Sequence, residues 1–243
     1  MMNGAQNPIR GASDSFIEAG YDTLRLDFRG SGRSGGSMLE MTPITEVADL
    51  LYVVDYAVNR LNRRIVLCGH SLGGLVSLLA AAHIYGADVP GLGKILEKDN
   101  ADSADSLPND RTMLRSALSG LILFAPAVNI ESDSWAGRVA YETFDPVNIP
   151  DEVEVWGSSL SKEYFLAARQ MDTFRTISHY SGPACILMGE RDRIVELNLA
   201  ERIEAALPQA EMNIIPRGDH LFSRNSRIRA TDIAIRFLER LQA

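Results

Sequence analysis

The chain has 243 residues, of which 46% are hydrophobic, so it can bury the core of one large domain. It carries 24 Lys and Arg against 32 Asp and Glu, and the net charge of -8 would repel nucleic-acid phosphates and anionic lipid. Composition therefore argues against nucleic-acid and membrane partners. The sequence has no apolar run of bilayer length, and no charged stretch that leads into an apolar one as in a signal peptide.

The first expected strand comes very early in the chain. Residues 21–27 (YDTLRLD) have the pattern of a strand, and the glycine-rich stretch RGSGRSGG follows almost directly. A strand and a loop of this kind are typical of the middle of a domain. The sequence thus raises the question of whether the domain has lost its beginning.

A helix is expected next. Thr42 is a good N-cap and Pro43 a good first residue, and the apolar residues that follow recur at helical spacing. This spacing predicts a helix over residues 44–61 and places Asp49 and Asp55 on its solvent-exposed face.

Strand-like and helical patterns alternate over the rest of the chain. Strands are expected at residues 64–69, 120–127, 183–190 and 210–218. Helices are expected at residues 72–86, 197–207 and 230–241. Alternation of this kind predicts parallel strands joined by crossover helices, so the fold class is α/β with about five strands.

Two stretches interrupt the alternation within this single domain of residues 1–243. Residues 92–111 are acidic and polar with little to bury, which predicts a mobile surface insertion. Residues 129–181 hold both tryptophans, Trp135 and Trp156, and are too long for a bare connection. We expect this second stretch to form a lid over a site; a helical decoration that only completes the core is the alternative.

The most informative motif is a possible nucleophile. Gly69-His70-Ser71-Leu72-Gly73 matches G-x-S-x-G between a strand and a helix, where a sharp turn would hold the Ser71 hydroxyl clear of the sheet. Small residues at Gly69 and Gly73 would let the turn close. The helix would begin at Leu72, so the Leu72 N–H is the expected oxyanion donor.

A candidate acid and base follow in the expected order. Asp192 lies just past the end of one predicted strand, and His220 lies just past the end of the next. In α/β sheets, sites gather at such strand ends. His220 can remove the Ser71 proton if Asp192 orients its ring and stabilises its charged form.

Other titratable residues nearby have simpler interpretations. Glu190 and Asp219 compete with Asp192, but each is expected to be solvated or to cap a turn. His70 should face away from the Ser71 hydroxyl and pack or form a hydrogen bond, whereas His83 and His179 read as ordinary surface or core residues. The histidines have no metal-ligand spacing, so no metal is expected.

The glycine-rich stretch suggests a rival function, the binding of a dinucleotide. Gly30, Gly32 and Gly35 spell G-x-G-x-x-G after a predicted strand, as in dinucleotide-binding turns. Such a turn must open a helix at once, and here SMLEM comes before Thr42. The order of residues therefore argues against dinucleotide binding.

Together these residues resemble the α/β-hydrolase superfamily. Its landmarks match in order: D-x-R-G-x-G-x-S (residues 27–34), GHSLGG (69–74), G-x-x-D-x-x-V (189–195), and GDH before the last helix. More narrowly, the stretches TLRLDFRGSGRSGG, VVDYA, FAPA and FDPVNIPDEVEVW are similar to bacterial cinnamoyl or feruloyl esterases. The resemblance covers nearly the whole chain from Gly20 onward. It implies a mainly parallel sheet flanked by helices, with a lid insertion.

The resemblance also implies an activity. The chain would be a carboxylic ester hydrolase acting on hydroxycinnamate esters without a cofactor, and its partner would be a small-molecule ester. Ser71 would attack the carbonyl, His220 would take and return the proton, and Asp192 would orient His220. Trp156 matches a lid tryptophan that in this family packs against the bound aromatic acid; a tryptophan that only buries the lid is the alternative.

The beginning of the chain departs from the family. There, an H-G-aromatic loop supplies a second oxyanion N–H, and by the family's spacing it would fall just before Met1. Asn3-Gly4-Ala5 could be a shortened substitute with Ala5 as the donor. We expect instead that the loop and its early strand are missing, so residues 21–27 would pair directly with residues 65–68 or face a gap.

Several alternatives stay open at this point. A lipase, an acylglycerol hydrolase or a serine peptidase would share the same motifs, because the triad does not select the acyl group. An inactive chain that binds a ligand or a partner is the alternative of another class. A homo-oligomer is compatible with the sequence. Cys68 and Cys185 lie in apolar runs typical of buried thiols, and a reducing, cytoplasmic location fits them.

Overall fold

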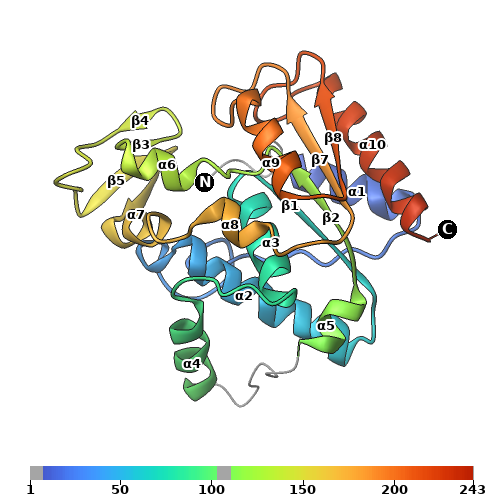
Figure 1. The fold of residues 1–243 in the computed structure, drawn as a ribbon, viewed down its shortest axis with the longest axis horizontal. Coiled ribbons are helices and arrows are strands. Elements are labelled where there is room, and N and C mark those ends of the chain that lie inside the picture. The colour runs from blue at the N-terminus through green and yellow to red at the C-terminus, as the bar shows by residue number, and fades with distance from the viewer. Residues whose placement is uncertain (1–7, 103–110, 243) are drawn as a thin grey trace.

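The centre of the molecule is a parallel β-sheet with helices on both faces (Figure 1). The computed structural model describes residues 8–102 and 111–242. The sheet has four strands in the order β1-β2-β7-β8. Their bounds are Ile65–His70 (β1), Leu118–Phe124 (β2), Ala184–Gly189 (β7) and Ala210–Ile215 (β8). The predicted α/β class and these four predicted strands are confirmed.

Alternation along the buried strands separates two cores. In β2, Leu121 and Leu123 face a core formed with α2 (Pro43–Asp55), α3 (Leu72–Ile84), α8 and α9, whose bounds are Thr173–Ile177 and Ala200–Ala206. Ile122 and Phe124 face the second core, which is covered by α1 (Pro8–Glu18) and α10 (Asn225–Gln242). Figure 1 shows α1 and α10 together on one side of the sheet. Both faces of β2 are therefore dry, as its unbroken apolar run predicts.

Helix α2 begins as the sequence predicts but differs at its end and on its surface. Thr42 is the N-cap and Pro43 the first helical residue, and after Asp55 the chain continues as a π-helix, η2 (Tyr56–Arg60). Asp49 does not lie on a solvent-exposed face, because its carboxylate binds the Arg29 side chain at 2.6 Å. The spacing of apolar residues in the helix could not predict an ion pair with an arginine 20 residues earlier in the chain.

The acidic insertion is partly ordered by the same arginine. Residues 92–111 were expected to be mobile, but α4 (Leu92–Asp102) is a helix that packs on α2. Leu92 is buried, and the Arg29 guanidinium binds Asp99 at 2.8 Å. The remaining acidic residues of the insertion, up to residue 110, lie outside the described part of the chain. A second helix, α5 (Thr112–Ala117), leads into β2.

The strand predicted over residues 21–27 does not form. This stretch is extended, but within the described residues it belongs to no sheet, and β1 is an edge strand. Of the two arrangements expected from the sequence, direct pairing with residues 65–68 is therefore wrong. Leu26 and Phe28 still pack against the core, and their burial accounts for the alternating pattern. Alternation predicts an extended backbone, but a strand also needs a partner within hydrogen-bonding reach.

Residues 129–181 form a small unit that lies mainly beside the sheet, to the left in Figure 1, while its last helix, α8, packs against α3 and α9. Its elements are α6 (Ile130–Trp135), β3 (Arg138–Val139), β4 (Glu142–Thr143), β5 (Glu152–Val155), β6 (Ser158–Ser161), α7 (Lys162–Ala168) and α8. The unit has its own apolar core, which includes Val153, Leu160 and Phe165. A short 3-10 helix, η1 (Met38–Glu40), packs against β6. The unit leaves the sheet after β2, at the edge where the parallel strands end.

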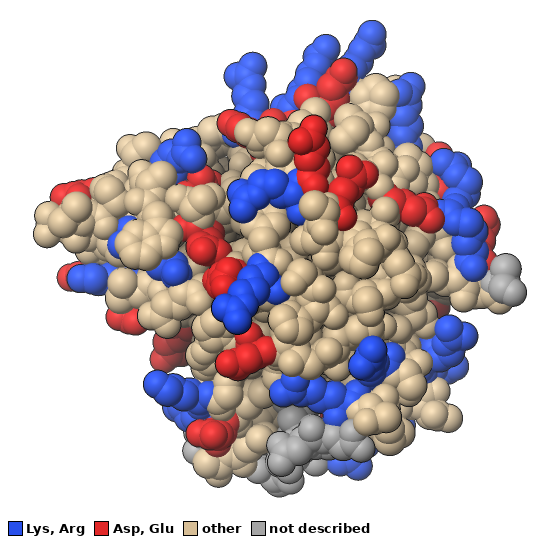
Figure 2. Space-filling model, in the orientation of Figure 1, with Lys and Arg blue, Asp and Glu red and all other residues tan. Residues whose placement is uncertain are grey.

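The last helices are close to prediction. The expected helix over residues 197–207 is a 3-10 turn, η3 (Leu197–Leu199), followed by α9, and α10 begins five residues before its predicted start at residue 230. None of the helices within residues 8–102 and 111–242 is both long and apolar enough to span a bilayer. Acidic and basic side chains are interspersed on the face drawn in Figure 2.

Candidate active site

A sharp turn between β1 and α3 presents Ser71. Its φ of 55° and ψ of -120° are strained for a residue with a side chain, and such strain clusters at functional sites. A Cβ on Gly69 would lie 2.1 Å from the Gly73 carbonyl oxygen, so only glycine fits there. The same need predicted for Gly73 is wrong, since a Cβ there would meet open space; Gly74 is the tighter position, at 3.0 Å from Pro126.

Backbone hydrogen bonds tie this turn to the end of β2. The Ser71 N–H donates to the Phe124 carbonyl, and the Ser71 carbonyl accepts from the Ala127 N–H at 3.0 Å. Ala125 between them has a φ of 43°. The FAPA stretch thus supports the serine directly, a contact that spacing in the sequence could not reveal.

Ser71, His220 and Asp192 lie in one hydrogen-bonded chain. Ser71 Oγ is 2.9 Å from His220 Nε2, and His220 Nδ1 is 2.8 Å from Asp192 Oδ2. A carboxylate only accepts, so the ring proton sits on Nδ1 and leaves the Nε2 lone pair for the serine proton. The structure thus brings together the three residues that the sequence predicted as a triad.

Asp192 is held rigidly for this contact. Its second carboxylate oxygen, Oδ1, accepts from the N–H groups of Ile194 at 2.8 Å and Val195 at 3.0 Å. Asp192 is 8% exposed and His220 is 4% exposed, so bulk water does not compete for their hydrogen bond. A buried ionised carboxylate is well placed to stabilise an imidazolium beside it.

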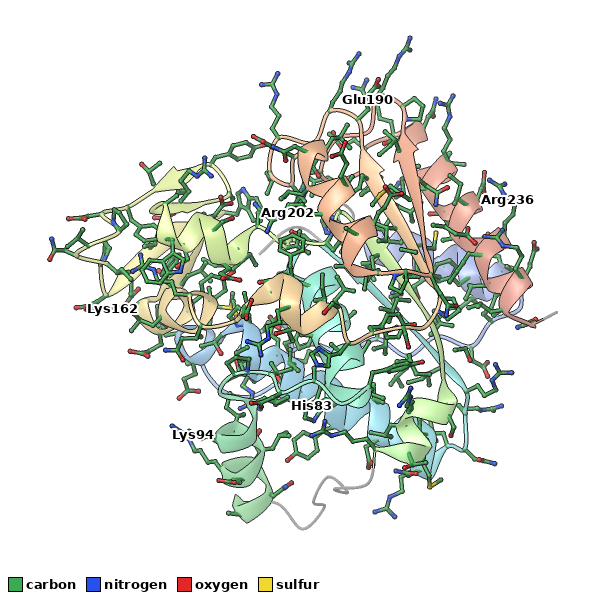
Figure 3. All side chains as sticks on the ribbon, viewed as in Figure 1. His83, Lys94, Lys162, Glu190, Arg202 and Arg236 are labelled. Atoms are coloured by element: carbon green, nitrogen blue, oxygen red, sulfur yellow. The ribbon has the colours of Figure 1, made fainter. Side chains whose placement is uncertain are left out.

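The two competing carboxylates serve the loops instead. Glu190, labelled in Figure 3 at the end of β7, accepts the Arg217 N–H at 2.7 Å. Asp219 accepts the Ser223 N–H at 2.8 Å. Both are thus occupied in turns, as their structural interpretation predicted.

The remaining histidines lie where the sequence suggested. His70 Nε2 forms a hydrogen bond with the His220 carbonyl oxygen at 2.7 Å. His179 is exposed and contacts carbonyls at the end of α8. His83 lies near the end of α3, and burial with the nearby Arg111 lowers its pKa to about 4. Within residues 8–102 and 111–242, no three His, Cys, Asp or Glu side chains are grouped so that they could hold a metal ion.

Leu72 is one of the two predicted oxyanion donors. Leu72 is the first residue of α3, so its N–H has no acceptor within the helix and lies beside Ser71 at the positive helix end. Ala5 lies outside the described residues. Leu72 is therefore the candidate donor that the structure positions.

Trp156 occupies the tip of the β5–β6 hairpin. Val155 pairs with Ser158, so Trp156 and Gly157 form a two-residue turn, with φ values of 52° and 76°. Such turns prefer Asn or Gly at the first position, so a tryptophan there is unfavourable for folding. Trp156 is 47% exposed, so it is only partly covered by the rest of the unit.

The glycine-rich stretch is a self-contained loop. Gly30 and Gly32 have φ values of 74° and 55°, and a Cβ on Gly32 would lie 2.3 Å from the Asp27 carboxyl carbon. The loop leads into η1, and α2 begins only at Pro43. It opens no α-helix, so it lacks the geometry of a dinucleotide-binding turn.

The comparisons with known proteins agree with this geometry. A family model described as "Alpha/beta hydrolase family" matches residues 10–230. The structure of Est1E from Butyrivibrio proteoclasticus with bound ferulic acid matches with a TM-score of 0.77 at 26% identity, over 97% of this chain and 84% of that chain. A second Est1E structure matches at 0.73 and 25%, over 96% and 81%. RutD of Variovorax paradoxus (strain S110), whose name proposes a carbamate hydrolase, is 24% identical over 221 residues, 86% of this chain and 78% of RutD.

Proposed function

The chain belongs to the alpha/beta hydrolase family, and on that premise we propose that it is a serine carboxylic ester hydrolase working through Ser71, His220 and Asp192. The observation that carries the proposal is the continuous hydrogen-bonded chain from Ser71 Oγ through His220 to Asp192. A serine is a weak nucleophile until a neighbouring base removes its proton. These residues supply that base and the group that orients it.

The reaction would proceed through an acyl-enzyme. Ser71 Oγ attacks the ester carbonyl as its proton passes to His220 Nε2, and the Leu72 N–H stabilises the oxyanion. The C–O bond to the alcohol then breaks, and His220 returns the proton to the departing alcohol. Water attacks the acyl-enzyme with His220 again as base, which releases the acid and restores Ser71.

Covalent labelling tests this assignment. We expect a fluorophosphonate probe to form an adduct on Ser71, located by mass spectrometry of the purified chain. Ser71→Ala should remove the label without loss of folding. A folded wild-type chain that stays unlabelled, yet binds an aromatic acid, would instead support the inactive, ligand-binding alternative.

For the acyl group, we propose a hydroxycinnamate. Support comes from the likeness to Est1E, whose structure holds ferulic acid, and from a half-exposed tryptophan kept at a strained position. The unit of residues 129–181 would act as the lid that carries this tryptophan. Higher turnover of methyl ferulate than of methyl butyrate, of an acylglycerol and of a carbamate would support it. Preference for any of the others would favour that substrate class.

Replacing Trp156 should separate folding from substrate preference. Trp156→Asn suits the turn better, so we expect equal or higher thermal stability. The loss of a stacking surface should lower kcat/KM for methyl ferulate about tenfold and leave methyl butyrate nearly unchanged. Tyr141→Asn, at another exposed aromatic of the same unit, is the control and should change neither ester. An equal loss of kcat/KM on both esters would contradict a contact between Trp156 and the hydroxycinnamate acyl group.

We also propose a reducing, cytoplasmic location. Cys68 and Cys185 are free, and both pair in register with Ile122 of the strand between them. Two strand spacings, about 9.6 Å, exceed the reach of a disulfide. Cys68 and Cys185 therefore cannot form a disulfide with each other in this fold.

A further inference from the structure

His70, which directly precedes Ser71, contacts the loop that carries the catalytic base His220. It is the last residue of β1 and shares a strand face with Val66 and Cys68, which pack into the core under α1 and α10. The strained φ of Ser71 turns the chain directly afterwards, so adjacent residues point to different sides. Ser71 thus meets the His220 ring at Nε2 while His70 meets the backbone of the same residue.

The hydrogen bond between the two histidines has a defined direction. His70 Nε2 lies 2.7 Å from the carbonyl oxygen of His220, and a carbonyl can only accept. The proton of the His70 ring is therefore on Nε2. His220 is 4% exposed, so a carbonyl deprived of this donor would be left buried without compensation.

Contacts between aromatic rings also hold the loop that carries His220. The His70 and His220 rings are 4.8 Å apart between centroids, and Phe222 stands at a steep angle to His70 at 6.3 Å. Phe222 is fully buried against Phe124 and has a φ of 49°, unusual for a bulky residue. A loop with such backbone strain needs fixed neighbours to keep one conformation.

His70 stays neutral in this position. Burial, with a smaller effect of the neighbouring His220, lowers the pKa of His70 to about 4, against weaker opposing effects of the hydrogen bond to the His220 carbonyl and of Asp192. Its Nε2–H therefore persists through the neutral range, and no second positive charge faces His220 when that ring accepts the serine proton. The titratable groups that act on His70 are thus His220 and Asp192, the other two members of the proposed triad.

Resting on the proposed function, we propose that His70 is a positioning residue that holds His220 in register with Ser71 by donating from Nε2 to the His220 backbone carbonyl. It touches neither the substrate nor the reacting atoms. Its effect is geometric, because a base displaced by about 1 Å can lose about a hundredfold in rate.

Two amides that differ by one methylene group test the hydrogen bond. Gln places its side-chain N–H near the Nε2 position, whereas Asn falls short of the carbonyl. We expect His70→Asn to lower kcat about 30-fold with KM changed less than twofold. His70→Gln should restore kcat to within about threefold of wild type. The same pair at His83, a half-buried histidine at the opposite end of α3 from Ser71, should leave kcat unchanged.

Equal kcat values for His70→Gln and His70→Asn would overturn the proposal. NMR of the imidazole nitrogens provides a readout that needs no turnover. In wild type, His70 should carry its proton on Nε2, and the His220 Nδ1 proton bound to Asp192 should be sharp; it should remain so in His70→Gln and broaden in His70→Asn. An Nδ1–H tautomer at His70 in wild type overturns the proposal even if a variant fails to fold. Absent Ser71 labelling with this NMR pattern intact would refute the esterase function and leave the positioning contact standing.

Discussion

Asp192→Asn should lower kcat by about 10⁴-fold while the chain stays folded. In the structure, Asp192 Oδ1 accepts two backbone N–H groups, so an asparagine would keep its oxygen there and turn its NH₂ toward His220 Nδ1. That NH₂ can only donate, so His220 would carry its proton on Nε2 and lose the lone pair that faces Ser71. Steady-state kinetics with methyl ferulate, at matched thermal stability, measure the effect.

Neighbouring carboxylates provide matched controls. Glu190→Gln and Asp219→Asn make the same chemical change in the same two loops, where each carboxylate accepts one backbone N–H. An amide oxygen can accept that bond equally well, so we expect kcat within about threefold of wild type. A large loss of kcat at Glu190 or Asp219 with a small loss at Asp192 would mean that Asp192 is not the acid of the triad.

The catalytic constellation was readable from the sequence because its signals are local. G-x-S-x-G between an apolar strand and a helix fixes the turn at Ser71, and the ends of β7 and β8 fix where Asp192 and His220 must lie. Parallel strands then bring those ends to one edge of the sheet. Once the strand ends meet at that edge, Ser71, His220 and Asp192 come within hydrogen-bonding distance of one another.

Features that depend on distant partners were not readable in the same way. The stretch over residues 21–27 has strand-like alternation, but no partner strand lies beside it within the described residues. The α4 helix is held through Arg29, which lies 70 residues from Asp99 along the chain. Amphipathic patterns report which face is buried, whereas ion pairs and sheet pairing depend on what the fold brings alongside.

A buried carboxyl in α2 escaped the sequence analysis for the same reason. Glu46 is 7% exposed, and every other buried residue of α2 is apolar. Helix α7 of the 129–181 unit packs against α2, and the pKa of the Tyr164 hydroxyl on α7 is raised by burial and, to a smaller extent, by Glu46. Glu46 thus lies where the sheet-bearing part of the molecule meets this unit.

Stability should fall as the pH rises toward 8 because of Glu46. Burial, with a smaller effect of Asp49, raises the pKa of Glu46 from 4.5 to about 8 in the folded chain. Between these values the native state binds a proton that the unfolded state does not, so stability decreases with pH. From pH 6 to pH 9 the loss from this one group should reach about 3 kcal/mol. Denaturant unfolding of wild type and Glu46→Gln at both pH values measures it.

The comparison isolates one group because other titrations cancel between the two proteins. Glu46→Gln keeps the shape without the charge, so we expect its advantage over wild type to grow by about 3 kcal/mol between pH 6 and pH 9. Glu163→Gln, an exposed carboxyl on α7, is the matched control and should track wild type at both pH values. A constant difference between Glu46→Gln and wild type would mean that Glu46 is already ionised at pH 6. Growth of the difference would instead show that the folded chain keeps Glu46 protonated at pH 6 and loses stability as this carboxyl ionises.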